Sequence, residues 1–118
     1  MLSLLHSEGV VKRKLPLPLL VRMLSYAPSR LFGLYPRKGV LQPGSDADIV
    51  IFDPHKPWVI EREGLFYKNK QSPFIGMAVT GAVVSTLLRG KLVYRNGEIV
   101  APPGTGRFLR RQSFRETE

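Results

Sequence analysis

The chain has 118 residues, of which 43% are hydrophobic and 23% are charged, a composition typical of a folded globular domain. Its length suffices for one domain but falls short of the roughly 200 residues that an α/β barrel needs. The sequence contains no cysteine, which excludes disulfide bonds and thiolate metal sites. The apolar start, residues 1–5, is too short for a signal peptide or a membrane span, so we expect a cytoplasmic protein.

The net charge of +9 is concentrated near the two ends of the sequence. Lysines and arginines occupy residues 12–14, and a second cluster comprises Arg107, Arg110, Arg111 and Arg115. A basic domain can bind nucleic acid through such clusters. We interpret them as the solvated ends of a piece of a larger protein, and nucleic-acid binding stays an alternative.

Residues 1–33 read as helical. An apolar stripe at i, i+3, i+4 and i+7 spacing indicates an amphipathic helix, and its members are Leu17, Leu20, Val21 and Leu24. Pro28 is expected to end this helix and to open a second short one that Gly33 terminates. Residues 1–8 predict another short helix before these two.

After Gly33 the apolar period becomes strand-like, with Gly and Pro at most breaks. Strands are expected at residues 40–41, 48–52, 58–61, 81–89, 91–95 and 98–100. The turn dipeptides Arg89-Gly90 and Asn96-Gly97 join the last three of these strands into a meander. The continuous apolar run 49–52 is typical of a strand that is covered on both faces.

These patterns predict an α+β fold in which N-terminal helices precede a small, mainly antiparallel β domain. We expect a helical segment at residues 1–38, the strands of a β-sandwich at 39–103 and a basic surface tail at 104–118. No internal repeat interrupts this order.

The residues that bear reactive groups do not form a recognisable site. His6 and His55 are far apart in sequence and outside any metal-binding spacing, so we interpret both as surface imidazoles. Three carboxylates beside Pro and Gly, those of Asp46, Asp48 and Asp53, are expected to make local Asx-turn bonds.

Nucleophile and phosphate-loop motifs are equally weak. Ser45, Ser72 and Ser85 lack a nucleophile elbow, and the glycines of residues 104–106 do not follow a buried strand. We therefore predict no catalytic, cofactor-binding or metal-binding residue in this chain.

Several segments, in order, resemble the C-terminal end of the cyclic amidohydrolases, the family of dihydroorotase, allantoinase and hydantoinase/dihydropyrimidinase. Residues 4–10 (LLHSEGV), 17–25 and 27–34 (APSRLFGL) are similar to the family's last barrel helices. Residues 43–50 (PGSDADIV) resemble its return strand into a small β domain. Residues 67–70 (YKNK) and 72–74 (SPF) are most similar to the allantoinase and dihydroorotase branch.

The resemblance implies a TIM-type barrel in which one or two divalent metals, such as Zn²⁺, activate water to hydrolyse a cyclic amide. In the family, these metals are held by histidines, a carboxylated lysine and an aspartate that lie upstream of the matched region, so no ligand is carried over to this chain. The resemblance implies a fragment that is inactive alone. Its expected partners are the remainder of the barrel or a second copy, which would cover the stripe that begins at Leu17, unless that stripe packs onto the β half.

Two alternatives stay open beside the fragment of a hydrolase. One is a small basic β domain that binds nucleic acid, and the other is a structural or oligomerisation module. Neither predicts a membrane partner.

Overall fold

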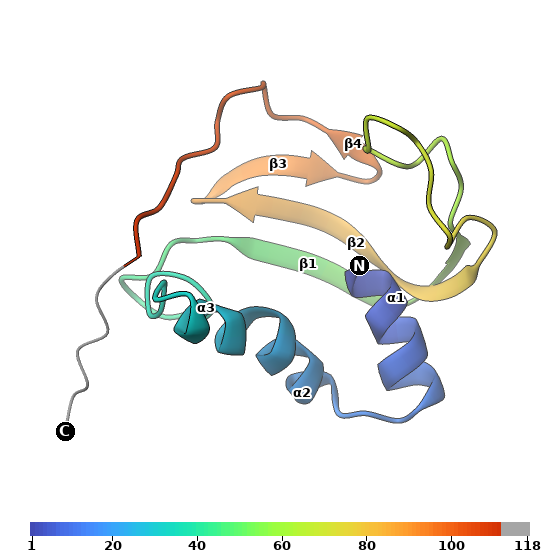
Figure 1. The fold of residues 1–118 in the computed structure, drawn as a ribbon, viewed down its shortest axis with the longest axis horizontal. Coiled ribbons are helices and arrows are strands. Elements are labelled where there is room, and N and C mark those ends of the chain that lie inside the picture. Colours follow the sequence, from blue (N-terminus) through green and yellow to red (C-terminus); the bar gives the residue numbers. More distant parts are fainter. Residues whose placement is uncertain (112–118) are drawn as a thin grey trace.

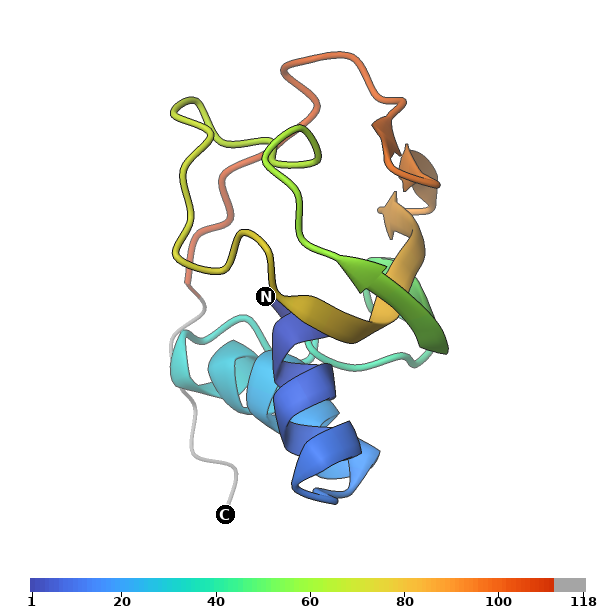
Figure 2. The same ribbon diagram turned by 90° about the vertical axis from the view of Figure 1, so that its right-hand side faces the viewer.

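The computed structural model describes residues 1–111 and places a helical half against a four-stranded antiparallel sheet, as the sequence predicted (Figure 1). The strand order β1-β2-β3-β4 follows the chain. Figure 2 shows the helices on one side of the twisted sheet and the loop between β1 and β2 on the other. Among the described residues, no helix is long and apolar enough to cross a membrane.

The first helix is longer than predicted. Helix α1 (Leu2–Leu5) continues without a break into the π-helical segment η1 (His6–Lys12). Gly9 therefore lies inside the helix and does not end it. An ion pair between Glu8 and Lys12, one turn apart, stabilises this second half of the helix.

The second helical stretch also departs from the prediction, because Pro28 does not break it. Helix α2 (Leu17–Val21), the π-helical segment η2 (Arg22–Tyr26) and helix α3 (Ala27–Leu31) follow one another with helical backbone angles at each junction. Pro28 sits in the first turn of α3, where no amide donor is needed, and the wider π turn precedes it.

Gly33 ends the helix as predicted, with a φ of +66°. The amide of Gly33 donates to the Arg30 carbonyl at 3.2 Å, and that of Leu34 donates to the Ser29 carbonyl at 2.8 Å. This pair of bonds is a Schellman motif, which satisfies the last carbonyls of the helix.

The sheet contains one long first strand where the sequence predicted two. Strand β1 (Ile49–Val59) pairs with β2 (Ala78–Leu88), and its register shifts between Asp53 and Pro57. The Asp53-Pro54 step is therefore an irregularity within one strand and not its end. The structure assigns no strand to residues 40–41.

The meander of the last three strands is confirmed. Strand β3 (Lys91–Arg95) pairs with β2 on one side and with β4 (Glu98–Ile99) on the other. Residues 101–111 follow without regular structure, and Arg115 lies outside the described residues. The division of the chain into three segments stays a prediction.

Little apolar surface is buried between the two halves. Among residues 1–111, the buried hydrophobic side chains are those of Leu20, Ile60 and Val79. Val50 and Ile51 are about half exposed, at 49% and 51%, so the prediction that β1 is covered on both faces is wrong for this structure. Of the predicted helical stripe, Leu20 is buried, whereas Leu17 and Val21 are exposed.

Candidate functional site

The most buried polar contact joins the first helix to strand β2. His6 is 2% exposed, and its Nδ1 atom lies 2.8 Å from the carbonyl oxygen of Thr80. Ser7 Oγ accepts a bond of 3.1 Å from the amide of the same Thr80. The two side chains thus satisfy both main-chain groups of one strand residue, and the prediction that His6 is a surface imidazole is wrong.

Close packing at Gly81 explains why this contact forms. A Cβ atom at Gly81 would lie 2.5 Å from Cζ of Phe52 and 2.6 Å from Nδ1 of His6, so only glycine leaves room for both rings. The two rings meet edge to face, with centroids 5.0 Å apart. Trp58 Nε1 donates to the Gly81 carbonyl at 2.9 Å, which fixes the peptide from the β1 side.

A second polar cluster fastens the end of the helical half to the sheet. Lys38 Nζ contacts the carboxylates of both Asp46 and Asp48, and Arg37 Nε donates to Asp46 at 3.0 Å. Asp48 Oδ1 accepts a bond of 2.8 Å from the Arg89 amide in the β2–β3 turn. Asp46 and Asp48 therefore form ion pairs in place of the predicted Asx turns.

The electrostatics of this cluster are those of paired charges. Burial alone would lower the pKa of Lys38, but hydrogen bonds and charge interactions with Asp46 and Asp48 outweigh it and raise that pKa above its ordinary value. The hydrogen bond from Lys38 lowers the pKa of Asp46. Burial acts in the opposite direction, and the hydrogen bond from Arg37 lowers this pKa further. With these shifts, Lys38 and Asp46 stay charged at neutral pH, so neither is poised for proton transfer.

The other predicted groups remain separate. Asp53 Oδ1 accepts a bond from the His55 amide at 2.9 Å, which is the predicted Asx turn, and His55 is exposed. Ser45 Oγ donates to the Pro36 carbonyl, and Ser72 Oγ accepts from the Phe74 amide. No hydrogen bond joins a serine to a histidine among the described side chains.

A hydrolytic metal does not fit the residues present. Within residues 1–111, no three His, Cys, Asp or Glu side chains come together as a possible metal site. The two carboxylates beside Lys38 are bound to cations, and His6 has no second ligand of these types close enough to complete a site within the described residues.

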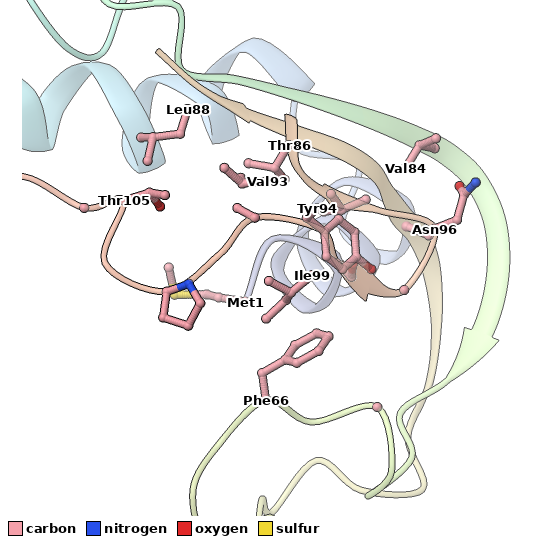
Figure 3. A pocket seen from close by; sticks show the side chains of 18 of the residues that line it. Met1, Phe66, Val84, Thr86, Leu88, Val93, Tyr94, Asn96, Ile99 and Thr105 are labelled. Atoms are coloured by element: carbon pink, nitrogen blue, oxygen red, sulfur yellow. The ribbon is translucent and has the colours of Figure 1, made fainter. Parts of the chain in front are cut away.

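An apolar groove of about 1110 Å³ lies on the sheet, between the β1–β2 loop and the residues after β4. Figure 3 shows Phe66, Tyr94 and Ile99 around this groove. Phe66 packs edge to face on Tyr94, with ring centroids 6.2 Å apart. The polar groups along it, among them Thr86 and Asn96, are few, and no nucleophile–base pair lines it.

Comparison with known proteins assigns the chain to a family. The model of the amidohydrolase family matches residues 1–93. The chain belongs to this family. A D-phenylhydantoinase of Escherichia coli O1:K1 / APEC is 42% identical over 113 residues, which are 96% of this chain and 24% of that relative.

Solved structures of amidohydrolases agree with this assignment. The dihydropyrimidinase of Brevibacillus agri NCHU1002 superposes with a TM-score of 0.91 at 41% identity, covering 98% of this chain and 25% of that one. The L-hydantoinase (dihydropyrimidinase) of Arthrobacter aurescens gives a TM-score of 0.88 at 41% identity, with 92% and 24% covered. The predicted cyclic amidohydrolase resemblance and the TIM-type family fold are thereby confirmed.

The amidohydrolase chain described here spans about a quarter of the length of the relatives it matches. These relatives are named hydantoinases and dihydropyrimidinases, whereas residues 67–74 favoured the allantoinase and dihydroorotase branch. The contact of His6 and Ser7 with Thr80 and the Lys38 cluster were not predicted from the sequence. Two basic residues before the Pro43-Gly44 turn and two acidic residues after it were a signal for the cluster.

Proposed function

We propose that this chain forms the C-terminal quarter of a metal-dependent cyclic amidohydrolase, and that the complete enzyme hydrolyses a C–N bond of a hydantoin-like ring. The observation that supports this most is the likeness to hydantoinases over nearly the whole chain, in both sequence and backbone. Because the relatives bear hydantoinase names, we place the substrate in that class, ahead of allantoin or dihydroorotate.

In this proposal the metal, Zn²⁺ or another divalent ion, and the reacting groups belong to the remaining three quarters of the enzyme. The carboxylates of Glu8, Asp46, Asp48 and Asp53 are engaged in ion pairs or a turn, which supports a structural part for this chain. It supplies helices to the barrel and strands to the neighbouring β domain, and alone it is inactive. We also propose a cytoplasmic location for the enzyme.

A chimera tests this proposal. The matched segment of the Escherichia coli D-phenylhydantoinase is replaced by residues 1–111 of this chain, and hydantoin ring opening is measured with Zn²⁺ present. We expect the chimera to hydrolyse hydantoin, and the same relative without any C-terminal segment to be inactive. A folded chimera without activity would contradict the proposal.

The isolated 118-residue chain is the second arm of the test. We expect no turnover of hydantoin, dihydroorotate or allantoin with added Zn²⁺. Any metal-dependent rate from the chain alone would show that it carries its own reaction centre.

The alternative of a nucleic-acid-binding module rests on the net charge of +9. Several of the cations are already paired within the molecule, since Lys12 and Arg13 contact Glu8, and Arg37 and Lys38 contact Asp46. These pairs weaken the basic clusters as a phosphate-binding surface. A salt-dependent affinity for oligonucleotides would favour this alternative.

A further inference from the structure

Residues 101–106, which we call the strap, form one wall of the apolar groove. The strap is fastened at both ends. At its start the Val100 amide donates to the Val93 carbonyl at 3.0 Å, in continuation of the sheet. At its end the Thr105 carbonyl accepts a bond of 2.7 Å from Nη2 of Arg89.

The backbone at Arg89 is unusual for a residue with a long side chain. Its φ is +48°, in the left-handed region that glycine and asparagine adopt most easily. The Arg89 amide donates to Asp48, and the next amide, that of Gly90, donates to the Ala47 carbonyl at 2.9 Å. These bonds hold the turn from the β1 side and aim the guanidinium at the strap.

We propose that Arg89 is a latch that keeps the strap closed along the groove. Arg89 to Thr105 is one exposed hydrogen bond, so thermal motion breaks it readily. The strap contains Gly104 at a φ of +83°, with no heavy atom within 4 Å of an added Cβ, so little packing restrains it there. When the bond breaks, the strap swings about Val100 and uncovers the groove side of β2 and β3, where Leu88 and Val93 lie (Figure 3).

The proposal assigns a conformational role to Arg89 and does not depend on which reaction the complete enzyme performs. It explains why an arginine occupies a turn position that asparagine or glycine would fill with less strain. The same turn joins the latch to the helical half, because Asp48 binds both the Arg89 amide and Lys38.

The substitution Arg89→Asn tests the role of the guanidinium group without changing the β2–β3 turn. Asn-Gly is a strongly favoured hairpin dipeptide, so the β2–β3 turn is kept while the guanidinium is lost. We expect the backbone ¹⁵N order parameters of Gly104, Thr105 and Gly106 in the 118-residue chain to fall from a rigid value of about 0.85 to below about 0.6, because the bond to the Thr105 carbonyl is lost. The order parameters of the paired residues of β2 and β3 are expected to stay unchanged.

Two matched variants complete the experiment. Arg89→Lys keeps the charge but not the planar donor group, so it should lower the order parameters of the strap less than Arg89→Asn does. Arg62→Asn, in the exposed β1–β2 loop, should leave the strap unchanged. Unaltered order parameters of the strap in Arg89→Asn, or an equal fall throughout β2 and β3, would overturn the proposal.

A dye that binds apolar surface gives a second readout. We expect 8-anilinonaphthalene-1-sulfonate fluorescence to rise several-fold in Arg89→Asn, because the open strap exposes the groove. The loss of a cation would by itself weaken binding of this anionic dye, so the rise would come from the apolar surface. A fall in fluorescence together with unchanged order parameters of the strap would show that the groove is open in the parent chain and that Arg89 does not control it.

Discussion

Gly81 sets how closely the helical half approaches the sheet. The substitution Gly81→Ala places a Cβ against His6 and Phe52 at less than 3 Å, at a φ of +108° that alanine rarely adopts. Neither ring can move away cheaply, because both are held between α1 and the sheet. We expect a loss of roughly 2–4 kcal/mol in the free energy of unfolding, measured by urea denaturation.

Gly97→Ala is the matched control for this substitution. Gly97 has a similar φ of +95°, but no heavy atom lies within 4 Å of its added Cβ. This variant carries the backbone strain without the clash, and it should cost roughly 1 kcal/mol. Equal losses in the two variants would mean that strain, and not packing on His6, determines the effect.

His6 also shows what a sequence leaves undetermined at this scale. Its position after an apolar pentapeptide gives no sign that a strand residue 74 positions later will accept its hydrogen bond. The Asx turn at Asp53, by contrast, was predictable because donor and acceptor are two residues apart. The local bond at Asp53 could be read from the sequence, whereas the contacts of His6 and the ion pairs that replace the Asx turns predicted at Asp46 and Asp48 required the structure.

At the scale of elements, the cluster around Lys38 fastens the helical half to the sheet, and its stability depends on pH. The pKa of Asp46 is lower in the folded chain than its ordinary 3.8, so its contribution is present above that value and is lost as the pH falls through the folded pKa. The pKa of Lys38 is raised above 10.5, so its contribution is lost as the pH rises through that higher value.

The substitution Lys38→Met removes the effect of Lys38 and reduces that of Asp46, which keeps its bond to Arg37. We expect it to lower the free energy of unfolding at pH 7. We also expect this free energy to decline less steeply with pH in the variant, both below pH 3.8 and above pH 10.5. Urea midpoints measured across this range test the expectation. Glu98→Gln, at an exposed position of β4, should leave the pH profile in place, and an unchanged profile in Lys38→Met would show that the cluster contributes nothing.

The order and type of the elements followed from the sequence, whereas several boundaries did not. Gly33 and the Asn96-Gly97 turn act through local backbone preference, so they were predictable. Pro28 and Pro54 were expected to end their elements. A π turn before Pro28 and a register shift after Asp53 absorb the two prolines, and both depend on neighbours that the local pattern does not contain.

For the whole molecule, the prominent feature is apolar surface that the chain does not cover itself. The second helical stretch exposes the side chains of Val21, Met23, Leu31 and Phe32. A large exposed apolar surface is typical of a contact with another protein segment. If this chain is a quarter of a larger enzyme, as we propose, exposed side chains of these helices contact the rest of the barrel.

The double substitution Met23→Lys and Leu31→Lys tests this assignment. Both side chains are well exposed, at 59% and 77%, so the free energy of unfolding of the isolated chain should change by less than about 0.5 kcal/mol for each. Its self-association, followed by sedimentation velocity, should decrease.

In the hydantoinase chimera the same pair of substitutions should abolish activity, because two charges would enter a buried contact. Phe108→Lys, at a 92% exposed position after the strap, is the control that should leave chimera activity intact. Full activity of the doubly substituted chimera would exclude Met23 and Leu31 from the barrel contact.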